Sequence, residues 1–159
     1  DISHLLQIGG SSLTDPKEKI EDGDLLQSTV PRTYVPYRNG NLISIAASWA
    51  EVIGARSIWL GVVEEDGSGY PDCRADFINA QQKAINLGTA CERELEICTP
   101  LIKKDKTKIV QLGKDLGAPL HLSWSCYREN EHACGKCDSC LLRLRGFAGA
   151  GFTDPIPYR

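Results

Sequence analysis

The sequence contains no methionine, few aromatic residues and only three histidines. It also lacks an apolar run of the roughly 20 residues that a membrane-spanning helix needs. No charged segment followed by an apolar stretch opens the chain, so nothing indicates secretion. We therefore expect a cytosolic protein that does not bind membranes. Because the chain starts at Asp1 without a methionine, we also expect that it was cut from a longer protein or that its start lies elsewhere.

An excess of basic residues is also missing. The formal net charge is −3, and the isoelectric point is about 5.6. Proteins that bind the phosphate backbone of nucleic acids normally carry a basic patch, so we expect no direct nucleic-acid binding. The densest basic cluster, residues 103–108, is interrupted by Asp105. We interpret it as the solvated start of a helix.

The 159 residues suffice for one compact domain. The first 40 residues are rich in turn-forming residues and predict irregular structure, with short ordered pieces near Leu5 and Leu13. Beyond them, helical and strand patterns alternate, which predicts an α/β fold with a parallel sheet. The expected elements are a helix over 42–54, a strand over 57–63, a helix over 74–87, a strand over 94–98 and a helix from 105 or 107 to 116.

Several residues in these elements have predicted roles. Asp72 is placed to cap the helix that begins at residue 74. The loop 64–74 leaves the carboxyl end of the best strand, where α/β sheets bind ligands, so it is the first candidate for an active site. Glu64 and Asp66 in this loop are either Mg²⁺ ligands or solvated acids. The apolar stripe of the first long helix is expected at Leu42, Ile45, Ala46, Trp49 and Ile53.

Four cysteines near the C-terminus have the spacing of a metal site. They are Cys126, Cys134, Cys137 and Cys140, in the pattern C-x7-C-x2-C-x2-C. Four thiolates complete a tetrahedron around Zn²⁺ and leave no open position for water, so we predict one structural zinc ion. An iron–sulfur cluster and unliganded thiols are the alternatives. A further alternative is that His132 replaces one of the cysteines as a ligand.

The seven cysteines form a poor disulfide framework, since their number is odd and four are crowded together. Cys91 and Cys98 are expected to be packed thiols. Cys73 lies in the candidate active-site loop and is either reactive or packed. Lys136 and Arg143 flank the metal motif, where they either stabilise the negative charge of the thiolates or face solvent.

Four stretches of the chain, taken together, resemble the 7-cyano-7-deazaguanine synthases, a family of ATP-pyrophosphatases. One is the cysteine segment, with Cys-Tyr-Arg at 126–128 and Ala-Cys-Gly-Lys-Cys-Asp-Ser-Cys at 133–140. The others are Thr-Tyr-Val-Pro-Tyr-Arg-Asn-Gly at 33–40, Gly-Tyr-Pro-Asp-Cys-Arg at 69–74 and Asp-Pro-Ile-Pro at 154–157. Their order and spacing fit this family over essentially the whole chain.

The resemblance implies an ATP-dependent carbon–nitrogen ligase of queuosine and archaeosine biosynthesis. It implies that 7-carboxy-7-deazaguanine, ammonia and Mg²⁺-ATP give the 7-cyano product through an adenylated carboxylate and an amide. The implied fold is that of the adenine-nucleotide α-hydrolases, a twisted parallel sheet with helices on both faces. Residues 1–120 would be part of this nucleotide- and substrate-binding domain, and 121–159 a zinc-binding subdomain with a C-terminal helix. A homodimer is also implied.

The chemistry of this reaction suggests roles for individual residues. Arg38 and Asn39, near a helix N-terminus, are expected to bind ATP, since adenylation develops negative charge on phosphorus. Tyr70 is expected to stack on the deazapurine and Asp72 to accept hydrogen bonds from its guanine-like edge. Arg74 is expected to bind the substrate carboxylate or a phosphate, and Asp72 and Arg74 are the candidate catalytic residues. The alternatives are that Arg38 and Arg74 only pair with neighbouring acids and that Asp72 only caps its helix.

The sequence departs from the family at its N-terminal phosphate loop, Ser-Gly-Gly-x-Asp-Ser. The nearest candidate, residues 9–12, lacks the aspartate and follows no convincing strand. The chain thus resembles the C-terminal two-thirds of the enzyme, and we expect it to be inactive alone. The N-terminal segment is in another chain, has been removed, or is truly missing in a divergent protein; these explanations are open. One alternative is a non-catalytic zinc-stabilised module that binds a nucleotide or a protein. Another is a related tRNA-modifying enzyme, against which the acidic isoelectric point counts.

Overall fold

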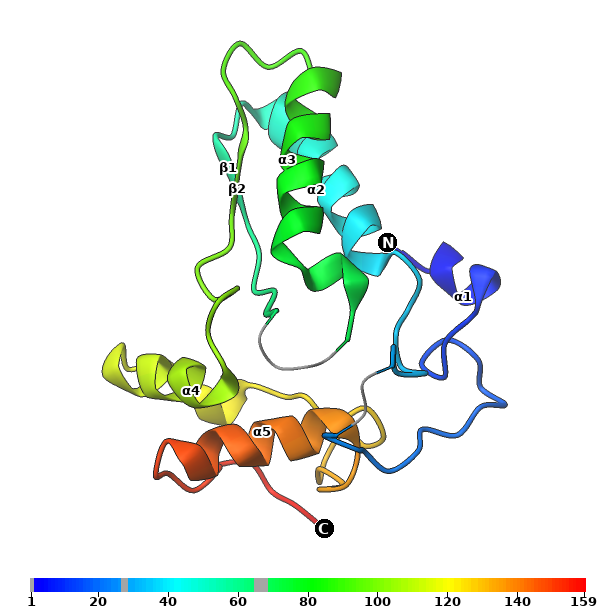
Figure 1. Ribbon diagram of the computed structural model, residues 1–159, viewed down its shortest axis with the longest axis vertical. Coiled ribbons are helices and arrows are strands. Elements are labelled where there is room, and N and C mark those ends of the chain that lie inside the picture. The colour runs from blue at the N-terminus through cyan, green and yellow to red at the C-terminus, as the bar shows by residue number, and fades with distance from the viewer. Residues whose placement is uncertain (1, 27–28, 65–68) are drawn as a thin grey trace.

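The computed structural model describes residues 2–26, 29–64 and 69–159 (Figure 1). Its helices and strands alternate in the order that the sequence predicts. They are α1 (His4–Ile8), α2 (Arg38–Ile53), β1 (Ser57–Trp59), the short 3-10 helix η1 (Pro71–Cys73), α3 (Ala75–Gly88), β2 (Glu96–Cys98), α4 (Lys106–Asp115), the 3-10 helix η2 (Leu120–Leu122) and α5 (Asp138–Gly149). In Figure 1, α2, α3 and the strands form one half of the molecule, and α4 and α5 form the other.

The two strands pair in parallel, which confirms the predicted α/β class. Ser57 is paired with Glu96, and Trp59 with Cys98. Both strands are shorter than predicted, although the Leu60 N–H still donates to the Cys98 carbonyl at 2.9 Å. Pro100 comes two residues after β2 and has no N–H to extend the ladder, so regular pairing ends here.

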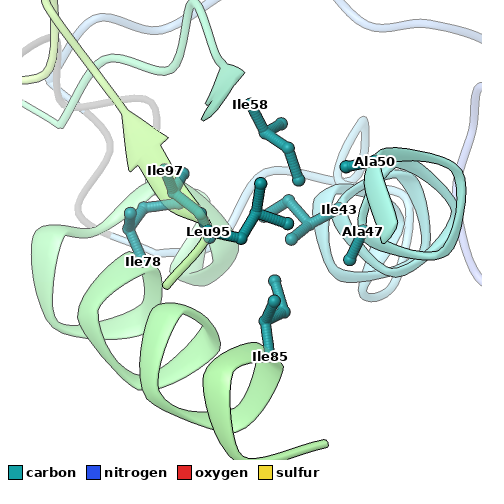
Figure 2. Packing of buried hydrophobic residues seen from close by; sticks show 8 residues of the cluster. All are labelled: Ile43, Ala47, Ala50, Ile58, Ile78, Ile85, Leu95 and Ile97. Carbon is teal, nitrogen blue, oxygen red and sulfur yellow. The ribbon is translucent and has the colours of Figure 1, made fainter. Parts of the chain in front are cut away.

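The main core lies between the strand pair and the two helices α2 and α3, which cover the same face (Figure 2). Burying an isoleucine or leucine side chain of this core contributes roughly 1.5–3 kcal/mol before the entropy cost is subtracted. The buried members are Ile43, Ala47, Ala50, Ile58, Ile78, Ile85, Leu95 and Ile97.

The predicted apolar stripe of the first long helix is wrong except for Ala46, which packs against the core. Trp49 is 69% exposed and Ile53 is 66% exposed, whereas Ile43, Ala47 and Ala50 on another face are buried. This helix carries apolar residues on two faces, so periodicity alone does not identify the buried one. The face with isoleucine and two alanines packs inward, which leaves the bulkier face exposed.

Helices α4 and α5 pack closely because glycines lie at their contact. A Cβ atom on Gly146 would lie 2.6 Å from Cβ of Lys106, and one on Gly149 would lie 2.4 Å from Oγ1 of Thr107. Either distance is too short for real atoms, so the contact requires residues without side chains. This packing joins α4, before residue 120, to α5, after it. The predicted division into residues 1–120 and 121–159 stays a prediction.

The first 40 residues are largely irregular, as predicted, with α1 burying Leu5. Helix α1, and not a strand, precedes residues 9–12, so this stretch does not have the setting of a phosphate loop. Further along, the N–H of Gly23 donates to the carbonyl of Lys136 at 2.7 Å, and the N–H of Asp24 donates to Asp138 at 3.1 Å. The N-terminal segment therefore packs on the cysteine-rich segment. Within the described ranges, every helix is too short or too polar to cross a bilayer.

Candidate active site and metal centre

A cavity of about 700 Å³ lies where α2, the end of β1, the cysteine segment and the α4–α5 pair meet. Its volume is that of a small-molecule site. Residues 60–63, which follow β1, form part of its wall, so the cavity lies at the carboxyl end of this strand, as predicted. Arg38, Asn39, Tyr70 and Cys73 also line it. The structure thus brings together three of the predicted ligand-binding residues, Arg38, Asn39 and Tyr70.

Helix α2 begins four residues earlier than predicted because of Tyr37. Its φ angle is 54°, in the left-handed region, which costs a non-glycine residue roughly 1–2 kcal/mol. The ring meets Phe77 edge-on at 5.6 Å between centroids. A Cβ on Gly40 would lie 2.2 Å from the Tyr37 ring, so only glycine fits beside it. This turn starts α2 at Arg38 and places Arg38 and Asn39 in its first turn, at the cavity wall.

Asp72 caps α2 and not α3, so the predicted cap is wrong. The backbone N–H of Asn39 donates to Oδ2 of Asp72 at 2.8 Å, and the Asn39 side-chain amide donates to the Asp72 carbonyl at 3.2 Å. Arg74 occupies the N-cap position of α3 without a side-chain capping bond. The short helix η1 turns the carboxylate back toward α2, where the helix dipole favours negative charge. Asp72 is only 3% exposed and supports the cavity wall from behind.

Cys73 lies on the cavity wall and accepts a hydrogen bond from the Asn39 side chain at 3.2 Å. Burial raises the pKa of its thiol, and the charge of Asp72 raises it further. The thiolate is the nucleophilic form of cysteine, and a raised pKa keeps the thiol protonated at neutral pH. The structure therefore favours the packed role that the sequence left open for Cys73.

Two further residues of the loop with predicted roles, Arg74 and Glu64, are exposed. Arg74 is exposed at the start of α3, and it is not among the residues described as lining the cavity. Glu64 is exposed as well, and Asp66 lies outside the described residues. The roles predicted for Arg74 in catalysis and for these acids in Mg²⁺ binding stay predictions.

The four predicted metal ligands converge. Their sulfur atoms all lie within 4.8 Å of one another, and the sulfurs of Cys134 and Cys140 are 3.9 Å apart. Zn–S bonds of about 2.3 Å in a tetrahedron place sulfurs about 3.8 Å apart, so the group fits a tetrahedral ion. His132 is exposed and lies outside this group. The group consists of Cys126, Cys134, Cys137 and Cys140.

Backbone N–H groups surround the sulfurs. Cys126 accepts from the N–H of Arg128, and Cys134 accepts from the N–H groups of Lys136 and Cys137, all at 3.4 Å. Burial raises the pKa of Cys134, but these two N–H donors and hydrogen bonds from the Cys126 and Cys137 side chains outweigh it and bring the pKa to about 7. Donors of this kind stabilise metal-bound thiolates and fix their orientation.

The cation beside the thiolates is Arg128, which the sequence analysis did not single out. Its guanidinium interacts with the charges of Cys134 and Cys137 and forms a hydrogen bond to Asp22 that raises its pKa. Arg143, predicted to face either the thiolates or solvent, instead donates to Asp154 through Nε at 2.6 Å and Nη2 at 2.8 Å. The Tyr158 hydroxyl donates to the same carboxylate at 2.6 Å.

A family model described as Queuosine biosynthesis protein QueC matches residues 1–151. The chain belongs to this family. It is 55% identical to the 7-cyano-7-deazaguanine synthase of Chlorobium phaeobacteroides (strain DSM 266) over 98% of its own length and 69% of that protein. It is 52% identical to the enzyme of that name from Chlorobaculum parvum, over 99% of this chain and 70% of the relative. It is 54% identical to the enzyme of that name from Nitratiruptor sp., over 100% of this chain and 72% of the relative.

Membership of the QueC family confirms the resemblance inferred from the motifs, three of which lie inside the matched range. Two functional candidates were missed by sequence reasoning. Tyr127, directly after the first cysteine, lines the cavity, and Thr33 hydrogen-bonds to Tyr70 from the other side. Both residues lie inside motifs that carried the resemblance, but their side chains alone suggested no specific chemistry.

Replacing one thiol of the cysteine group tests its function. We expect Cys137→Ser to lose its metal ion to a chelator that leaves the unchanged protein loaded, and to melt at a lower temperature, because metal binding contributes folding free energy. Metal content after dialysis and thermal unfolding measure both effects. Cys91→Ser, outside the group, is the control and should behave like the unchanged protein. Full metal retention by Cys137→Ser would contradict this assignment.

Removing the charge of Asp154 tests the buried ion pair. We expect Asp154→Asn to lower the free energy of unfolding at pH 7 by about 3–5 kcal/mol, because Arg143 loses its anion. The side chains of Arg143 and Asp154 are only 11% and 3% exposed. Chemical denaturation measures the loss, and Asp22→Asn, which breaks the exposed pair with Arg128, should cost less than about 1 kcal/mol.

The same pair predicts a pH dependence. Burial raises the pKa of Asp154, but the hydrogen bonds from Arg143 and Tyr158 outweigh this effect. The pKa of the folded protein therefore lies below the ordinary value of 3.8. The stabilisation is therefore fully present above this value and is lost as the pH falls through the lower, folded-state pKa. The difference in stability between the unchanged protein and Asp154→Asn should shrink from about pH 4 downward. A difference that stays constant to pH 2 would refute this.

Proposed function

We propose that this protein is a 7-cyano-7-deazaguanine synthase acting on 7-carboxy-7-deazaguanine, ammonia and ATP. One observation carries the proposal. The Gly-Tyr-Pro-Asp-Cys-Arg stretch and the cysteine segment, both within the range that matches the family, contribute Tyr70, Cys73 and Tyr127 to the wall of one cavity. The same wall holds Arg38 at the first turn of α2. A cavity with aromatic walls and a cation suits a planar heterocycle whose carboxylate is to be activated.

In the proposed reaction, the substrate carboxylate attacks the α-phosphorus of ATP and pyrophosphate leaves. Ammonia then displaces AMP and gives the primary amide, with loss of a proton. The amide oxygen then attacks the α-phosphorus of a second ATP, and pyrophosphate leaves again. Release of AMP with this oxygen and loss of both N–H protons gives the nitrile. Each adenylation develops negative charge on phosphorus. We assign the stabilisation of this charge to Arg38, in the first turn of α2 at the cavity wall.

The other roles follow from position. Tyr70 would stack on the deazapurine, and Asn39 would hold the nucleotide. Asp72 is engaged with the backbone of Asn39, and we assign it first to holding the start of α2. Its contact with the heterocycle, and the binding of the substrate carboxylate by Arg74, stay predictions.

The ion held by the four cysteines is proposed to be zinc with a structural role. Four protein ligands leave no position for substrate or water, so the ion would stabilise the segment without taking part in the reaction. An iron–sulfur cluster is the alternative, and metal analysis distinguishes the two.

The larger assembly is also a proposal. We infer the twisted, two-sided sheet of the adenine-nucleotide α-hydrolases, a homodimer in the cytoplasm, and a phosphate loop supplied by a segment outside these 159 residues. Two observations support a missing or partner segment. The relatives are longer than the stretch that matches, with 69–72% of their length covered. Moreover, large apolar side chains such as Trp49 and Trp59 are exposed.

The assay combines purified protein with 7-carboxy-7-deazaguanine, ammonium and Mg²⁺-ATP, and detects nitrile and AMP by mass spectrometry. We expect nitrile from the protein encoded by the complete gene and no ATP turnover by the 159 residues alone. In the complete protein, Arg38→Ala should lower kcat/KM by about 10²-fold or more, since it removes the charge that we assign to stabilising the phosphorus. Arg56→Ala, an exposed arginine outside the cavity wall, is the matched control.

Two outcomes would contradict the proposal. Substrate binding without AMP release by the complete protein would favour a non-catalytic binding module. Retarded migration of tRNA at physiological salt, together with no nitrile, would favour a tRNA-modifying relative.

A further inference from the structure

Two tyrosines from distant parts of the chain meet in the cavity wall. The Tyr70 hydroxyl lies 2.8 Å from Oγ1 of Thr33 and 3.4 Å from the Tyr127 hydroxyl. Tyr70 directly precedes η1, whereas Tyr127 directly follows the first cysteine of the metal group. Both rings line the cavity, and Thr33 is buried beside it. Both tyrosines are therefore accessible to a ligand that occupies this part of the cavity.

The position of Tyr127 is set by the cysteine group. It directly follows Cys126, one of the four cysteines, and the N–H of the next residue, Arg128, donates to the Cys126 sulfur at 3.4 Å. The Tyr127 side chain packs on the small core that these cysteines form with Ala133 and Ile156. A change in the geometry of the four sulfurs thus moves the backbone that carries the Tyr127 hydroxyl.

Tyr70 is linked in the same way to the start of α2. The N–H of Cys73 donates to the carbonyl of Tyr70 at 3.1 Å. Asp72 and Cys73 in turn hold Asn39 through the hydrogen bonds described above. The hydroxyl pair is therefore a direct contact between the cysteine segment and the loop that positions the first turn of α2.

We propose that Tyr127 is a positioning residue that couples the metal centre to ligand binding in the cavity. This inference rests on the proposed function for the identity of the ligand. The oxygen–oxygen distance of 3.4 Å is long for a hydrogen bond between hydroxyls, and such contacts shorten when a ligand fills the site. A ligand that draws the two hydroxyls together stabilises the metal-bound geometry. By reciprocity, the bound metal raises the affinity for the ligand by the same factor.

The test measures metal loss from the complete, metal-loaded protein to a chelator, with and without saturating 7-carboxy-7-deazaguanine. At equilibrium with the competing chelator, we expect the ligand to lower the dissociation constant of the metal about fivefold or more, and Tyr127→Phe to remove this protection. Tyr127→Phe and Tyr70→Phe should each weaken ligand binding in calorimetry. In the double variant the loss should be smaller than the sum of the two single losses, because both variants remove the contact between the two tyrosine hydroxyls.

Tyr158→Phe is the matched control. Its ring also packs on the cysteine core, but its hydroxyl bonds to Asp154 and not to Tyr70. We expect it to lower thermal stability and to keep the ligand's protection. If Tyr127→Phe keeps the protection, or if Tyr158→Phe loses it equally, the coupling through Tyr127 is refuted.

A parallel measurement with AMP separates this inference from the proposed function. Suppose that AMP, but not the deazapurine, protects the metal from the chelator, and that Tyr127→Phe loses this protection. That result would support the coupling and reject the proposed substrate. Protection of the unchanged protein by neither ligand would overturn the coupling. Nitrile formation in the synthase assay would still support the proposed function in that case.

Discussion

The cavity depends on one buried hydrogen bond, from the backbone N–H of Asn39 to the carboxylate of Asp72. The bond joins two segments 33 residues apart, and a hydrogen bond to a charged group contributes about 1.5–3 kcal/mol. Together with the bonds from the Asn39 side chain to the Asp72 carbonyl and the Cys73 sulfur, it fixes the loop that carries Tyr70 and Cys73 relative to α2. The left-handed turn at Tyr37 serves the same purpose, since it starts the helix where the carboxylate can cap it.

The opposite wall depends on the cysteine group in a comparable way. The segment between the first and last cysteine contains little regular structure before α5, so the sulfurs and their N–H donors organise it. A metal ion there acts on the cavity through Tyr127, which lies in the wall. In this account a structural ion influences ligand binding without touching the ligand, because the fold places its coordinating segment beside the site.

Much of this arrangement was predictable from the sequence, and the failures have physical causes. The four cysteines have a spacing that only a compact ligand group explains, so their convergence was predicted correctly. Helices and strands with strong periodicity were found as well. The buried face of α2 was not, because Ile43 and Trp49 belong to two apolar stripes and only tertiary packing selects between them. The partner of Asp72 was missed because it is distant in sequence, and the left-handed Tyr37 has no signature in the local sequence.

A crystal structure of the complete protein with 7-carboxy-7-deazaguanine, recorded with anomalous data, tests the central claim most directly. The claim is that the metal-binding segment and the loop 69–74 together form the substrate site. We predict the heterocycle in the cavity between Tyr70 and Tyr127, with a zinc signal among the four cysteine sulfurs. A ligand bound away from these two tyrosines, or a cysteine group without metal in an active protein, would contradict the account.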